Sequence, residues 1–93
     1  MKITISNSHL FEGMEEEILG QLDIPASANK FIELATIALK KEYPDVEIDS
    51  ANLYHGDKVT DNNGEEDFEE TQWVREITSK VYENWEWLIN KVA

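Results

Sequence analysis

Residues 68–92 read FEETQWVREITSKVYENWEWLINKV and carry the clearest structural pattern in this chain. Apolar side chains recur there at spacings of three and four residues, which is the period of an amphipathic helix. They are Val74, Ile77, Val81, Trp85, Leu88 and Val92. Because a helix turns by about 100° per residue, these side chains share one narrow face. We therefore predict a long helix from Phe68 to Val92 that packs on a sheet.

Upstream of that helix, short stretches show the period-two alternation of half-buried strands. Ile3 and Ile5 alternate with polar residues, which predicts a first strand near the N-terminus. Residues 46–60 predict two or three more short strands. Gly56 within this region suits the first position of a tight type II′ hairpin turn, where φ is positive. We expect these strands to form a small, mostly antiparallel sheet.

A second helix is predicted between the two strand regions. Pro25 and Ser27 form a start signal for it, and apolar residues follow at helical spacing. Its end is predicted at Tyr43, because the residue before a proline, here Pro44, avoids the helical backbone conformation. Residues 8–22 also show helical spacing but contain two glycines, so they predict an interrupted helix.

The length of 93 residues fits a single domain that spans residues 1–93. The order of the predicted elements indicates an α+β fold of two layers. In this fold two to three helices cover a small, mostly antiparallel sheet, and the C-terminal helix is long. The predicted core consists of Ile3, Ile5, Phe31, Leu34, Val46, Ile48, Val74, Ile77, Val81, Trp85 and Leu88.

The charge of the chain excludes several classes of partner. Eight Lys and Arg residues stand against 20 Asp and Glu residues, which gives a net charge of −12. A field of this sign repels nucleic acid and anionic membranes and attracts basic proteins. We therefore expect no direct binding of nucleic acid and no binding to membranes. With no cysteine, no apolar run long enough to cross a bilayer and no leader pattern, a cytoplasmic protein is expected.

The sequence shows no catalytic signature. Its four glycines are too far apart for a phosphate-binding loop, and it contains no serine nucleophile motif. His9 and His55 stand alone, with no second histidine or cysteine at the spacing of metal ligands. We expect that the protein is not an enzyme and that it binds neither a cofactor nor a metal.

Acidic residues concentrate before and along the predicted C-terminal helix. The predicted partner-binding acids are Asp61, Glu65, Glu66, Asp67, Glu69, Glu70, Glu76, Glu83 and Glu86. One interpretation is that acids at a helix start favour the helix dipole and keep the protein in solution. The other is that a surface this acidic imitates the phosphates of nucleic acid and binds a basic groove.

Trp87 is the predicted aromatic member of this binding surface. It lies about 220° around the helix from Val74, nearly opposite the apolar face. A tryptophan rimmed by polar residues is the residue type most enriched at binding hot spots. We therefore predict that Trp87 is exposed and contacts a partner, either a basic protein or a second copy of the chain. The alternative is a singly exposed aromatic without a partner, or one that packs under a loop.

Three segments carry a resemblance to a known family. The residues YPD at 43–45, VREI at 74–77 and YENWEWL at 82–88, with the order of the predicted elements, resemble the DinI-like family of small regulators of the RecA recombinase. The resemblance implies an α/β sandwich whose last helix presents an acidic face to the RecA filament in place of single-stranded DNA, within the SOS response. The contacting acids that it implies are Glu76, Glu83 and Glu86.

These observations predict a class of function. The leading hypothesis is an acidic, non-enzymatic regulator or inhibitor that occupies the basic surface of a DNA-processing protein as a DNA mimic. It would be a modulator of a RecA-type recombinase or a phage or plasmid anti-restriction or anti-CRISPR protein. The alternative is a structural or assembly module, in which acids serve solubility and an exposed tryptophan forms a homodimer. Affinity for a partner that falls steeply with salt would separate the first from the second.

Overall fold

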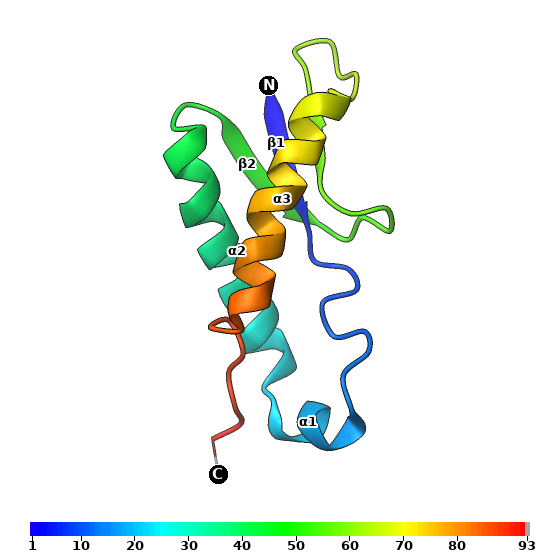
Figure 1. Ribbon diagram of the computed structural model, residues 1–93, viewed down its shortest axis with the longest axis vertical. Coiled ribbons are helices and arrows are strands. Elements are labelled where there is room, and N and C mark those ends of the chain that lie inside the picture. Colours follow the sequence, from blue (N-terminus) through cyan, green and yellow to red (C-terminus); the bar gives the residue numbers. More distant parts are fainter. Residues whose placement is uncertain (93) are drawn as a thin grey trace.

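Within residues 1–92, which the computed structural model describes, three strands and three helices follow one another along the chain. They are β1 (Lys2–Ser6), α1 (Glu16–Gln21), α2 (Ile24–Glu42), β2 (Glu47–Ala51), β3 (Lys58–Thr60) and α3 (Phe68–Asn84). The sheet lies towards one end of an elongated molecule, and α1 and the C-terminal tail lie at the other end (Figure 1). The last residue of the predicted domain, Ala93, lies outside the described residues.

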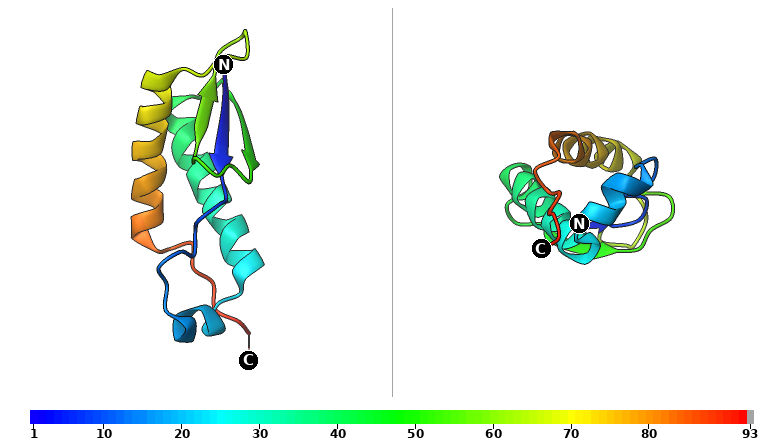
Figure 2. Two further views of the ribbon diagram at one scale, coloured as in Figure 1. Left: turned by 90° about the vertical axis from the view of Figure 1, so that its right-hand side faces the viewer. Right: turned by 90° about the horizontal axis from the view of Figure 1, so that it is seen from below.

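Helices α2 and α3 pack side by side on one face of the sheet, which makes two layers (Figure 2). Residues that pair across neighbouring strands share a face, so Ile3, Ile48 and Val59 point together into the core under the helices. The opposite face is polar and carries an ion pair between the Lys2 ammonium and the Asp49 carboxylate at 3.2 Å. The predicted two-layer α+β fold with a long last helix is confirmed.

The sheet is mixed rather than mostly antiparallel. Its strand order is β2-β1-β3, with β1 parallel to β2 and antiparallel to β3. The parallel pair is the longer one and joins all of β1 to all of β2. The reason lies in the connection: α2 runs back along the sheet, so the chain enters β2 in the direction of β1.

The predicted hairpin turn at Gly56 is wrong. Residues 52–57 form a loop, and β3 pairs with β1 instead of with the residues before the turn. The buried carboxylate of Asp57 holds this loop. It accepts hydrogen bonds from the Ser6 N–H at 2.7 Å and from the Thr78 hydroxyl at 2.5 Å. Because Asp57 is tied to both β1 and α3, the chain enters β3 beside β1.

Residues 8–22 contain less helix than predicted. Helix α1 covers only Glu16–Gln21, and turns precede it. His9 and Gly13 in these turns have positive φ values of 65° and 79°, which a right-handed helix does not allow. The segment therefore leaves β1 as a series of turns and becomes helical only near its end.

Helix α3 ends at Asn84 rather than at Val92. Trp85 follows with φ 60°, in the left-handed region, and its N–H donates to the Tyr82 carbonyl at 3.3 Å. This conformation reverses the chain, so the side chains after it no longer follow the helical period. Trp85 itself is 48% exposed. The predicted end of the helix and the predicted core position of Trp85 are therefore both wrong.

Trp87 is buried, contrary to the prediction, and takes the core position that the helical period gave to Trp85. It is 0% exposed. Its indole N–H donates to the Tyr82 carbonyl at 3.0 Å, and its ring stacks on that of Tyr82 with centroids 5.4 Å apart. The rings of Phe11 and Phe31 meet it edge-on, each with centroids at 5.5 Å. This aromatic cluster of four rings joins α2, α3, the segment after β1 and the C-terminal tail.

Apart from Trp85, the predicted core residues lie in the core or pack against it. Those that are buried are Ile3, Ile5, Phe31 and Val74. Those that are partly buried against them are Leu34, Val46, Ile48, Ile77, Val81 and Leu88. The structure adds the buried side chains of Leu10, Leu22, Ala35, Leu39, Val59 and Trp87.

The C-terminal tail is held against the start of α2 by hydrogen bonds. The buried hydroxyl of Ser27 accepts the Ile89 N–H at 2.8 Å and donates to the Ile89 carbonyl at 3.2 Å. The Asp23 N–H donates to the same carbonyl at 2.8 Å, and the Lys91 N–H donates to the Gln21 carbonyl at 2.8 Å. These bonds fix the tail on both sides of Asn90 and keep Trp87 in its place.

Trp87→Ala should cost roughly 3–5 kcal/mol of unfolding free energy, because it leaves a cavity among three other rings. Trp85→Gly is the matched control. It removes an exposed indole and places glycine where φ is positive, so stability should stay within about 1 kcal/mol of the wild type. Urea titrations followed by circular dichroism measure both. Equal losses, or a larger loss at Trp85, would contradict the structure.

Candidate functional site

The predicted acids lie in the loop before α3, on α3 and just after it, and they differ in exposure. Those that are exposed are Asp61, Glu65, Glu69, Glu76, Glu83 and Glu86. Those that are half-buried are Glu66, Asp67 and Glu70. Trp87, the predicted aromatic member of the surface, lies in the core, so it offers no contact to a partner.

Three of these acids stabilise the local fold. Asp67 caps α3, because its Oδ1 accepts the Glu70 N–H at 3.1 Å. Asp61 closes the preceding loop by accepting two backbone N–H groups of that loop, at 2.8 and 3.0 Å. The Glu70 carboxylate accepts the phenol O–H of Tyr43 at the end of α2. A structural role at the helix start accounts for these three side chains.

The bond between Tyr43 and Glu70 joins the end of α2 to the start of α3. Burial raises the pKa of the Tyr43 phenol above its ordinary value, and the hydrogen bond to Glu70 raises that pKa further. The phenol therefore keeps its proton throughout the neutral pH range and remains a donor. Glu70 is part of the fold and not of a free acidic surface.

Glu69, Glu76 and Glu83 are exposed along α3, and we call them the acidic row. They are seven residues apart, so they repeat about every two turns, or about 10 Å, on one face of the helix. The acidic loop of residues 61–67 lies beyond the first turn of α3 (Figure 1). No ion pair within residues 1–92 involves the row. The pairs found there join Lys2 to Asp49, His9 to Glu12 and Lys30 to Glu33.

Glu86 does not belong to this row. It lines a hollow of about 230 Å³ between α2 and α3, together with apolar side chains of both helices and with Lys41. The separation follows from the left-handed turn at Trp85, which takes Glu86 off the helical period. Of the three acids that the resemblance to DinI-like regulators implies, only Glu76 and Glu83 share a row.

A polar cleft of about 310 Å³ lies along the side of α3. Its walls come from the segment after β1, the loop before β3 and α3. Both histidines of the chain line it, and their rings meet the ring of Tyr54 edge-on, with centroids 5.1 Å away for His9 and 5.3 Å away for His55. Residues so distant in the sequence form no local motif, so their spacing gave no sign of this cleft.

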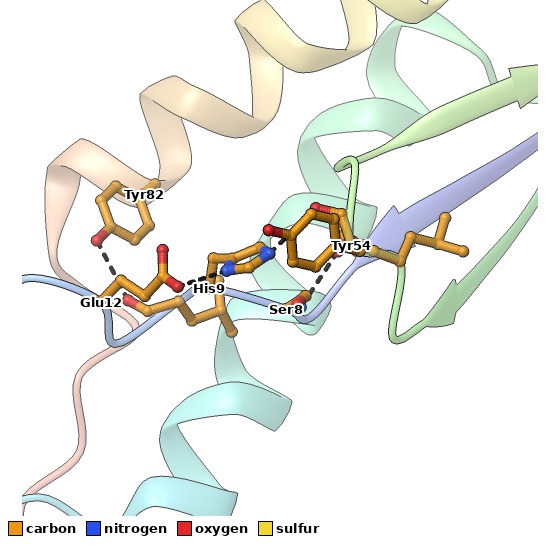
Figure 3. Close-up of polar contacts among 8 residues, drawn as sticks. Ser8, His9, Glu12, Tyr54 and Tyr82 are labelled. Carbon is orange, nitrogen blue, oxygen red and sulfur yellow. Dashed lines mark hydrogen bonds and ion pairs between the residues drawn. The ribbon is translucent and has the colours of Figure 1, made fainter.

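His9 bridges the turn after β1 and the loop before β3 at the rim of this cleft (Figure 3). Its Nδ1 lies 2.7 Å from Oε1 of Glu12, and its Nε2 lies 3.0 Å from the Tyr54 carbonyl oxygen. Both partners accept hydrogen bonds, so only the protonated imidazole, with two N–H groups, satisfies both. The hydrogen bond to Glu12 is the main cause that raises the pKa of His9. Beside it, the Tyr82 hydroxyl donates to the Leu10 carbonyl at 3.2 Å and holds the same turn.

The raised pKa of His9 predicts a stability that depends on pH. The stabilisation is full below the ordinary pKa of 6.5 and is lost as the pH rises through the higher pKa of the folded protein. The unfolding free energy of the wild type, minus that of His9→Gln, should be larger at about pH 5 than at about pH 9. Glu12→Gln should lower the pKa of His9, which an NMR titration of the ring protons measures. If the difference in unfolding free energy is the same at both pH values, or if Glu12→Gln leaves the pKa of His9 unchanged, His9 does not form this bridge.

Within residues 1–92, no helix combines the length and the apolar character that crossing a bilayer requires. No group of three or more His, Cys, Asp or Glu side chains in that part of the chain is placed to hold a metal ion. The chain matches no protein-family model, no curated protein and no solved structure in the comparisons made. Its own surface is therefore the basis for assigning a function.

Proposed function

We propose that this protein is a non-enzymatic regulator or inhibitor that binds the basic, nucleic-acid-binding surface of a DNA-processing protein. The proposed contact is the acidic row of α3, extended by the acidic loop of residues 61–67. One observation carries the proposal: Glu69, Glu76 and Glu83 are exposed on one helix face and form no ion pair within residues 1–92. A basic groove that binds phosphates would bind such a row by the same electrostatics.

The stability of α3 does not account for the acidic row. Acids in the first turn favour the helix dipole, and Glu69 fits that rule. Glu76 lies in the middle of the helix, where the dipole has little effect. Glu83 lies in the last turn, where a carboxylate faces the negative end of the dipole and the turn contains no basic residue. The helix dipole therefore gives no reason for Glu76 and opposes Glu83, which supports a role in binding for these two acids.

The spacing of the row is compatible with a mimic of a few phosphates. Phosphates of one DNA strand are about 3.4 Å apart along the helix axis. A step of about 10 Å in the row therefore corresponds to about every third phosphate. Three such charges, with the loop acids beyond them, suit a groove that holds a short stretch of nucleic acid. Salt screens contacts between such charges, so affinity would fall as salt rises.

Two kinds of DNA-processing partner fit this proposal. One is a recombinase of the RecA type, in line with the resemblance to DinI-like regulators of the SOS response. The other is a nuclease of a host defence system, which a phage or plasmid anti-restriction or anti-CRISPR protein would block. Both partners act in the cytoplasm, and a cytoplasmic site of action is part of the proposal.

The alternative of a structural module that dimerises through Trp87 loses its contact residue, because Trp87 is 0% exposed. Dimerisation through the acidic row would bring like charges together, which costs free energy. The tryptophans that do reach the surface are Trp73 and Trp85. The charge of α3 therefore favours a basic partner over a second copy of the chain.

Reversal of the acidic row, with Glu69, Glu76 and Glu83 all changed to Lys, should weaken partner binding strongly and leave the fold intact. The matched control changes Glu15, Glu16 and Glu17 to Lys. These three acids are also exposed, lie at or next to α1 at the other end of the molecule, and give the same change in net charge. Because exposed charges contribute only a few tenths of a kcal/mol each, thermal melts of both variants should stay close to the wild type.

The partner for this test is captured from a cell lysate at low salt, eluted at high salt and identified, and its displacement by single-stranded DNA is then measured separately. Titration calorimetry then gives its affinity for the wild type and for both variants. Loss of three charge contacts should weaken binding by the row variant about 100-fold or more, while the control should bind nearly as the wild type does. A folded row variant that binds like the wild type, or a partner that DNA does not displace, would refute the proposed function.

A further inference from the structure

The polar cleft along α3 is large enough for a small molecule. Its volume of about 310 Å³ lies at the lower end of the range for ligand pockets. Leu10 and Phe31, which are almost completely buried, provide apolar lining. Polar side chains surround them, among them Arg75 and the hydroxyl-bearing Ser79 of α3. The cleft is more polar than most ligand pockets, and it combines a small apolar contact with several polar groups.

Arg75 is the only arginine of the chain, and the loop before β3 holds its side chain in place. Its Nε donates to the Asp57 carbonyl at 3.1 Å, and its Nη2 donates to the His55 carbonyl at 3.0 Å. The guanidinium lies against Gly56, where a Cβ would sit 3.7 Å from Nε and 3.8 Å from Cζ. These contacts use one edge of the guanidinium. The N–H groups on the edge formed by its two terminal nitrogens remain available.

The Arg75 guanidinium has acidic neighbours but forms no ion pair with them: Glu76 and Glu83 line one adjacent hollow with it, and Glu66 lines another. No carboxylate within residues 1–92 forms an ion pair with it. Asp57 belongs to the loop that holds Arg75, but its carboxylate is turned inward, 8% exposed, and is bonded to Ser6 and Thr78. Two backbone carbonyls, and no carboxylate of residues 1–92, therefore hold the guanidinium of Arg75. Its available edge suits an anion that the chain does not supply.

We propose that this cleft binds a small organic carboxylate, with its carboxylate on the available edge of Arg75 and its apolar body on Leu10 and Phe31. The planar edge of a guanidinium matches the two oxygens of a carboxylate. A free phosphate fits less well, because it brings up to two negative charges into an acidic protein and has no apolar body. This proposal does not rest on the function proposed for the acidic row.

The test titrates the 93-residue chain with hydrocinnamate as the probe and monitors the backbone amides by NMR. Two comparison ligands are hydrocinnamide, which has the same apolar body without the charge, and inorganic phosphate. We expect saturable shifts at the cleft with hydrocinnamate, at least about tenfold weaker binding of the amide, and no saturation with phosphate over the same range. This comparison needs no variant, so it holds even if a substitution disturbs the cleft.

Variants test the residue itself. Arg75→Gln should weaken hydrocinnamate binding at least about tenfold, and Arg75→Lys should also weaken it because lysine lacks the planar edge. Lys80→Gln is the matched control, since it removes a charge from the same helix outside the cleft, and it should leave binding unchanged. Equal binding of acid and amide, saturable binding of phosphate, or a folded Arg75→Gln variant with unchanged affinity would overturn the proposal. An equal loss in Lys80→Gln would do so too, because net charge alone would then explain the binding.

Discussion

The burial of Trp87 connects parts of the chain that no strand pairing holds together. Its ring contacts Phe11 after β1, Phe31 on α2 and Tyr82 on α3, and the Tyr82 carbonyl accepts its indole N–H. The tail can reach this place only because Trp85 reverses the chain at the end of α3. A bulky residue with positive φ costs about 1–2 kcal/mol, and the full burial of an indole more than offsets that cost.

This arrangement fixes which face of α3 meets solvent. Val74 and Thr78 are buried, whereas Glu69, Glu76 and Glu83 are exposed. The early end of the helix also separates Glu86 from the row, since the chain has already turned back toward the aromatic cluster. Capping explains the acids at the start of α3, but it leaves the acids of the middle and the last turn without a structural role. Binding to a basic partner is the role that we propose for them.

Local patterns in the sequence predicted most elements of the fold. Helix α2 lies at Ile24–Glu42, close to the bounds that its start signal and Pro44 indicated, and α3 begins at the predicted residue. The failures share one cause, which is dependence on contacts between distant residues. No glycine marks the left-handed turn at Trp85. A helical period continued through that turn therefore places Trp85 in the core and Trp87 on the surface, which is the reverse of the structure. The acids were visible in the sequence, but the bond that engages Glu70 and the cleft around Arg75 arise only when separate segments meet.

The footprint on a captured partner tests the proposed mimicry most directly. Hydrogen exchange of that partner would be measured alone, with single-stranded DNA and with this protein. If the acidic row takes the place of phosphates, DNA and this protein slow hydrogen exchange in the same basic groove of the partner. The partner in turn slows hydrogen exchange in α3 and in residues 61–67 of this protein. Protection of a partner surface that DNA leaves unprotected would contradict the account.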